Sequence, residues 1–169
     1  MQRRVFLLAA AAAVAASSLS ACGFALRKAP SYAFQTIYSG VGEGSTLGIE
    51  LNRNLEASGM VKVIRDPRLI EQAQVILDVL LDQREKTVVG VNASGQVREF
   101  QLRTRFRFQL RTLKGKLLIP PSEIVLQRDI SFNESAVLAK EMEEALLYRD
   151  MQSDIVQQML RRLAAVKEI

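Results

Sequence analysis

Apolar and polar side chains alternate strictly along the middle of the chain. From Phe100 to Arg111 the even positions carry Phe, Leu or Thr, and the odd positions carry Gln or Arg. Because successive side chains of a β-strand point to opposite faces, this pattern predicts a strand with one buried and one solvated face. A hairpin turn is predicted at 114–116, and the returning strand runs from about Leu117 to Phe132. Pro120-Pro121 cannot donate to a ladder, so an edge, bend or bulge is expected there.

Shorter patterns precede this hairpin. Strands are predicted at 33–38, at 60–64 and at 73–81, where the extended character continues through 86–91 to a turn at 93–95. Leucines recur every four residues between Ser45 and Gly59, and Ser45 or Thr46 can cap exposed N–H groups. Gly59 is a good helix stop. These features predict a helix between the first two strands.

The last segment, Ser135 to Val166, predicts a long helix. Leu147 and Met151 are spaced four residues apart and point away from its main apolar arc. They are either a docking site for a partner protein or scattered surface apolar residues, which are normal. Arg149 and Gln152 interrupt the arc, which consists of Leu138, Met142, Ala145, Tyr148, Ile155, Val156, Met159, Leu160, Leu163 and Val166.

The order of these elements is β, α, several β, α. It predicts an α+β fold, a two-layer sandwich of about four mainly antiparallel strands with two helices packed on one face. Neither an internal repeat nor a second domain is evident, so residues 33–169 are expected to form a single domain.

The first 21 residues have the layout of a secretory signal peptide. Arg3 and Arg4 form a positive n-region, 5–16 is uninterrupted apolar sequence, and mostly small residues follow. The apolar run is too short for a comfortable bilayer span, which takes about 20 residues. We therefore expect 1–21 to be cleaved and 22–32 to form a tether.

Leu19-Ser20-Ala21-Cys22 resembles the bacterial lipobox, and Cys22 is the only cysteine of the chain. In such signals the thiol receives diacylglycerol, and the new amino group is acylated after cleavage. The expected covalent group on Cys22 is thus an N-acyl and S-diacylglycerol lipid, which would hold the chain on the outer membrane. The alternative is a buried or chance cysteine behind an ordinary signal peptide.

Composition bears on chemistry and on partners. The chain has 23 basic and 18 acidic residues, and two of the basic ones are Arg3 and Arg4. The remaining excess is too mild to predict a nucleic-acid partner. Histidine is absent, which removes the usual general base and metal ligand. We therefore predict a protein that is not an enzyme, with no catalytic residues, no metal site and no cofactor besides the lipid. The rival is a hydrolase that uses carboxylates of the last helix, such as Glu141 or Asp154.

Arginines at alternate positions of the central strand form a row. Arg103, Arg105 and Arg107 are expected about 6.8 Å apart on one face, and Arg128 of the next strand is a candidate to join them. Arginine is a forked, permanently charged donor that fits phosphate and carboxylate groups. The alternative is a solvated face on which these residues pair with acidic residues of neighbouring strands, a charge pattern that deters edge pairing.

The chain resembles the LptE family of lipopolysaccharide-assembly lipoproteins over most of the part that follows the signal peptide. The resemblance is carried, behind the lipobox, by Cys22-Gly23-Phe24-Ala25-Leu26-Arg27, by 95–102 (GQVREFQL), by 117–121 (LLIPP) and by the closing run 138–163.

The resemblance implies an outer-membrane lipoprotein that faces the periplasm and plugs a large β-barrel partner, LptD, with which it forms a heterodimer. It implies help in barrel assembly and binding of lipopolysaccharide for delivery to the cell surface. Arg128 matches a family arginine on the returning strand, and the same role for the row at 103, 105 and 107 is inferred from spacing. The alternative is a free-standing periplasmic lipid carrier or envelope adaptor.

Overall fold

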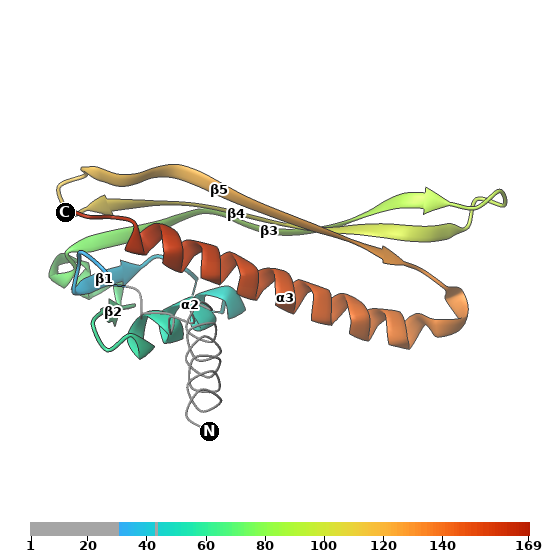
Figure 1. Cartoon of the computed structure of the whole chain (residues 1–169), viewed down its shortest axis with the longest axis horizontal. Coiled ribbons are helices and arrows are strands. Elements are labelled where there is room, and N and C mark those ends of the chain that lie inside the picture. The colour runs from blue at the N-terminus through green and yellow to red at the C-terminus, as the bar shows by residue number, and fades with distance from the viewer. Residues whose placement is uncertain (1–30, 43) are drawn as a thin grey trace, which may run out of the picture.

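The computed structural model describes residues 31–42 and 44–169, in which one five-stranded sheet carries both α-helices on the same face (Figure 1). This confirms the predicted α+β two-layer fold, with five strands instead of about four. β1 is parallel to β2 and β3, whereas β3, β4 and β5 form an antiparallel meander. In sheet order the strands are β2 (Lys62–Ile64), β1 (Thr36–Ser39), β3 (Val75–Val91), β4 (Val97–Thr112) and β5 (Leu117–Ser131).

The alternation in the sequence translates directly into burial along β4. The even positions from Leu102 to Leu110 are at most 2% exposed, and they face the helices. The two prolines of β5 form the expected irregularity: Phe108 pairs with Ser122 and Leu110 pairs with Ile119, so Pro120 and Pro121 together oppose one residue of β4. Such a bulge lets a strand with no N–H at two positions stay in the sheet.

The first helix, α2 (Thr46–Ala57), begins and ends as its sequence predicts. The Ser45 hydroxyl accepts a hydrogen bond from the Gly48 N–H at 3.3 Å. Leu47, Leu51 and Leu55 are buried. Short 3₁₀ helices, η1 (Pro67–Gln72) and η2 (Glu134–Ala136), connect β2 to β3 and lead from β5 into the second helix.

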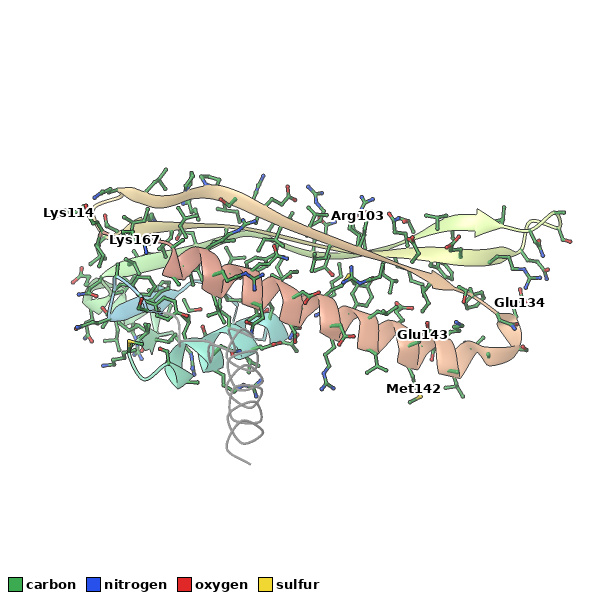
Figure 2. All side chains as sticks on the ribbon, viewed as in Figure 1. Arg103, Lys114, Glu134, Met142, Glu143 and Lys167 are labelled. Atoms are coloured by element: carbon green, nitrogen blue, oxygen red, sulfur yellow. The ribbon has the colours of Figure 1, made fainter. Side chains whose placement is uncertain are left out.

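The second helix, α3 (Val137–Ala164), is buried along its C-terminal half only. Leu138 and Met142 are 77% and 70% exposed, so their predicted place in the core is wrong. Figure 2 shows Met142 pointing away from the sheet. The reason is the short length of α2. This 12-residue helix lies against the C-terminal half of α3 and does not extend to its N-terminal half (Figure 1).

A polar cluster marks the point where α2 begins beside α3. Gln152 is buried, and its side-chain oxygen accepts hydrogen bonds from the Thr46 hydroxyl (2.6 Å) and Arg84 (3.0 Å). Its amide group donates to Glu50 at 2.7 Å, and Glu50 also accepts from Ser153. Gln152 interrupts the apolar arc because it joins α2, α3 and β3 through satisfied hydrogen bonds.

Two apolar clusters hold the layers together. The larger one joins α2, the C-terminal half of α3 and the wide end of the sheet. The smaller one consists of Leu102, Ile130 and Met151, with Leu147 and Tyr148 packed beside it. This smaller cluster attaches the middle of α3 to the narrow part of the meander, and it thereby positions the N-terminal half of α3 under β4 and β5.

Candidate functional site

The arginine row lies where the alternation predicts, on the sheet face opposite the helices. Arg103, in Figure 2, is on that side. Arg105 forms an ion pair with Glu123 at 2.9 Å, and Glu85 lies 3.7 Å from Arg103 and 4.0 Å from Arg105. Two of the three arginines therefore already have carboxylate partners on neighbouring strands, which is the arrangement expected of a solvated face. An anion would bind them only by exchange with these carboxylates.

The uncovered face as a whole is polar and close to neutral. Its positive charges come from the row and from Arg111, and cross-strand register places five acidic residues among them. Within the described part of the chain, the Arg107 side chain forms no ion pair or hydrogen bond. The residues of this face that carry charge are Asp78, Glu85, Glu99, Arg103, Arg105, Arg107, Arg111, Glu123 and Asp129.

Asp78 is the most strongly held carboxylate of this face. Arg111 donates to it at 2.7 Å and Gln109 at 2.8 Å. Burial by itself would raise the pKa of Asp78, but these hydrogen bonds and the charge of Arg111 outweigh it, so the pKa lies below its ordinary value. The pair stabilises the junction of β3 and β4 and offers no free charge to a ligand.

The expectation that Arg128 joins the row is wrong. Arg128 of β5 pairs with Leu102 of β4, and directly opposed residues of an antiparallel pair share a face. Arg128 therefore lies on the helix side, where it donates to Asp154 of α3 at 3.4 Å. The sequence could not reveal this, because the face of a β5 residue depends on the bulge and on the register of the hairpin.

The outward placement of Leu147 and Met151 is also wrong. Met151 is fully buried against Leu102 and Ile130, and Leu147 packs partly buried against the same cluster. The helical arc drawn from the sequence assumed one covering layer along its whole length. In the structure α3 faces α2 at one end and the meander along its middle, so the buried side of the helix changes along its axis.

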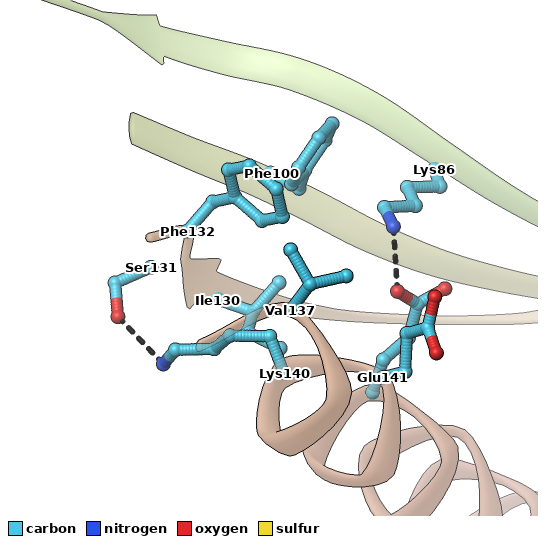
Figure 3. A pocket seen from close by; sticks show the side chains of 9 residues that line it. Lys86, Phe100, Ile130, Ser131, Phe132, Val137, Lys140 and Glu141 are labelled. Atoms are coloured by element: carbon cyan, nitrogen blue, oxygen red, sulfur yellow. Dashed lines mark hydrogen bonds and ion pairs between the residues drawn. The ribbon is translucent and has the colours of Figure 1, made fainter. Parts of the chain in front are cut away.

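The structure brings together a second group of cations that the sequence did not single out. Lys86 of β3 and Lys140 of α3 line a pocket of about 250 Å³ between the start of α3 and the ends of β4 and β5 (Figure 3). Phe100 and Phe132 form its apolar wall, with ring centroids 5.3 Å apart in an edge-to-face arrangement. The remaining lining residues are Ile130, Ser131, Val137, Glu141 and Glu144.

Both lysines of this pocket are held in place by acceptors. Lys86 contacts Glu144 at 2.6 Å and lies 4.4 Å from the centre of the Phe100 ring. Lys140 donates to the Ser131 hydroxyl at 3.0 Å and forms an ion pair with Glu143 at 2.9 Å. The pocket thus offers two ammonium groups beside an aromatic surface, a combination that suits an amphiphile with a phosphate head and an apolar body.

No local sequence pattern marks these lysines, because each stands alone on its own element. Only the packing of α3 under the meander brings them to one pocket. A group of three or more acidic, His or Cys residues placed to hold a metal ion is not found in residues 31–42 and 44–169. None of the described helices is both long and apolar enough to cross a bilayer. Cys22 lies outside the described residues.

Comparison with known proteins places the chain among bacterial lipoproteins. The family model described as "LptE: Lipopolysaccharide-assembly" matches residues 31–163. The solution structure of an uncharacterized lipoprotein B from Nitrosomonas europaea is 35% identical over 85% of this chain and 91% of its own, with a TM-score of 0.71. Rare lipoprotein B from Shewanella oneidensis, 21% identical, covers 78% of this chain and 94% of its own with a TM-score of 0.63, which shows the same fold. A search of curated proteins found no match.

Proposed function

The chain belongs to the LptE family of lipopolysaccharide-assembly lipoproteins, and from this premise we propose that it plugs the LptD β-barrel and binds lipopolysaccharide. A role in lipopolysaccharide assembly follows from the family. The proposal has two parts. The chain contacts the barrel as a one-to-one partner, and it binds lipopolysaccharide for delivery to the cell surface.

The uncovered face of the sheet supports the role of a plug. Charges of both signs are interspersed on it, and most of its arginines are paired with carboxylates of adjacent strands. Such a face is stable in water and compatible with the wet interior of a large barrel. Its near neutrality also avoids strong attachment of free anions.

The pocket between α3 and the meander is the observation that carries the binding of lipopolysaccharide. Lys86 and Lys140 can exchange their carboxylate partners for phosphate groups of the lipid A head, while Phe100 and Phe132 contact the apolar part. Arg107, exposed on the opposite face, is the member of the row that has no ion pair among the described residues, so it is the one free to contact an anion there. Arg103 and Arg105, like the two lysines, would have to exchange a carboxylate partner for an anion, and no apolar wall adjoins them in the described pocket.

Measurement of lipopolysaccharide binding by the purified chain tests this assignment. We expect Lys86→Gln with Lys140→Gln to weaken binding about tenfold or more, since two charge-assisted contacts are lost. Lys114→Gln with Lys116→Gln is the matched control, because it removes the same charge at the opposite end of the sheet. Equal binding by the two double variants would refute the pocket, and a loss confined to Arg107→Gln would move the site to the arginine row.

The barrel partnership is tested by co-purification after mild detergent extraction. A one-to-one complex with a large heat-modifiable barrel is the expected result. A lipid-loaded monomer without a barrel would instead favour a free-standing periplasmic carrier.

We further propose that Cys22 carries the N-acyl and S-diacylglycerol lipid and holds the domain on the periplasmic side of the outer membrane. Two or three acyl chains make membrane attachment stable, because each buried CH₂ contributes about 0.8 kcal/mol. Mass spectrometry of the processed N-terminus is the measurement: an unmodified Cys22, or an uncut precursor, would exclude the anchor.

A further inference from the structure

The sheet has free backbone edges, and they differ in how well they are guarded. The β2 edge spans only three residues. The β5 edge carries Pro120 and Pro121, and β5 also bears several charged side chains. Short length, proline and charge are the usual means by which proteins prevent further strands from adding. Both of these edges are therefore protected against the addition of a further strand.

The third edge belongs to the distal part of β3. β1 pairs with β3 only from Val75 to Leu77, whereas β4 follows β3 along its whole length. Beyond Leu77, the side of β3 away from β4 has no strand partner among the described residues. Figure 1 shows this stretch extending well past the short strands at the other end of the sheet. α3 packs chiefly on β4 and β5 and reaches β3 as far as Lys86, since Tyr148 donates to the Glu85 carbonyl oxygen at 2.8 Å. No hydrogen bond or ion pair among the described residues joins α3 to 87–91.

The last five residues of β3, 87–91 (TVVGV), are uncharged, and all except the half-buried Gly90 are exposed. Val88, Val89 and Val91 are 50%, 51% and 60% exposed. The segment has no proline, and three of its five residues are valines, which favour strands. An exposed run of this kind on a free edge presents both unpaired backbone groups and apolar side chains.

The charged residues just before this segment form contacts within the domain. Lys86 is held by Glu144 over the Phe100 ring, Arg84 donates to Gln152, and Glu85 lies beside Arg103. Lysine on an edge usually deters pairing by projecting into solvent. Here the tertiary contacts draw these charges away, so the irregular pairing around Gly90 is the protection that the edge at 87–91 retains.

We propose that residues 87–91 of β3 accept an extended, uncharged segment of the barrel partner as an added strand of the sheet. This inference rests on the proposed function. A row of backbone N–H and C=O groups at strand spacing is matched only by another extended backbone, which makes a polypeptide strand the fitting occupant. Because the segment carries no charge, the complementary strand is uncharged and rich in β-branched or aromatic side chains.

A second copy of this chain fits the edge poorly. The pairing of β3 with β4 is irregular between Val88 and Gly90 and again between Gly90 and Val91. A Cβ on Gly90 would stand 3.0 Å from the Cβ of Glu99, so this irregular backbone approaches β4 closely. A two-fold antiparallel pair centred here would set two irregular stretches against each other and interrupt the ladder on both sides, whereas a regular partner strand meets only one.

Hydrogen exchange of the full lipidated chain, free and in complex with the co-expressed LptD barrel, tests the proposal directly. Amides of 87–91 that already bond to β4 exchange slowly in both states. We expect the intervening amides to slow at least tenfold in the complex, which gives an alternating pattern that side-chain packing alone does not produce. Unchanged exchange at 87–91 in a complex that does form overturns strand addition and leaves the plug function standing.

A variant that adds lysines to the free edge gives an independent measurement. We expect Val88→Lys with Val89→Lys to lower the recovered complex about tenfold, while Met60→Lys with Leu69→Lys, two exposed apolar positions on either side of β2, leaves recovery unchanged. Circular dichroism of each variant checks its fold. Equal recovery of the complex with the two double variants overturns the proposal. A dimer of this chain in light scattering, with slowed hydrogen exchange at 87–91, overturns it as well. Failure of the wild-type chain to bind the barrel overturns the proposed function and this inference together.

Discussion

Replacing Met151 by alanine tests whether the small cluster holds α3 to the meander. Met151 is fully buried against Leu102 and Ile130, so truncation leaves a cavity in a cluster with few other members. Buried Met→Ala changes cost about 2–5 kcal/mol, and we expect about 3 kcal/mol here. For a domain of this size that corresponds to a fall of about 10 °C in Tm.

The same helix offers a matched control. Met142 is 70% exposed, so Met142→Ala should change the free energy of unfolding by less than about 0.5 kcal/mol. The assay is urea unfolding of the Cys22→Ala mature chain, followed by circular dichroism at constant pH. If the two variants lost equal stability, or if Met151→Ala cost less than about 0.5 kcal/mol, the helix would not be packed on the sheet as described.

Two further predictions concern the junction of β1, β3 and β4. The lowered pKa of Asp78 means that its pair with Arg111 stabilises the fold above the unfolded-state pKa of about 3.9, and that this stability is lost as pH falls through the folded-state pKa. Asp78→Asn should cost about 1 kcal/mol at pH 7 and nothing at the acid end of the titration; a deficit that did not change with pH would contradict this assignment. Gly40→Ala should cost about 1–3 kcal/mol in thermal unfolding, since its Cβ would meet the Leu77 carbonyl oxygen at 2.5 Å. Gly42→Ala, with nothing within 4 Å, is the control, and equal Tm values for the two would show that the contact can relax.

The elements themselves could be predicted from local sequence. Strict alternation predicted β4 and its buried face, the Ser45 cap predicted the start of α2, and the two prolines predicted the bulge of β5. Each of these features depends on backbone geometry within a few residues. A period of two or a missing N–H has the same consequence wherever the strand lies in the fold.

The candidate site depended on contacts that no local pattern contains. Arg128 fell on the helix side because the register of β5 against β4 decides its face. Lys86 and Lys140 met at one pocket because α3 folds back under the meander. Nothing in the neighbourhood of either lysine differs from an ordinary surface position.

By itself the sequence determined the alternating strand and the two helices of the described residues, and it predicted a lipid-attachment signal at 19–22. Only the tertiary structure decided which methionine of α3 is buried, which arginines stay free and which sheet edge is left open. The physical reason is that periodicity specifies the direction of a side chain relative to its own element, whereas burial and charge pairing depend on what lies across from it. That partner is set by layer lengths and strand register, both of which arise when distant segments pack.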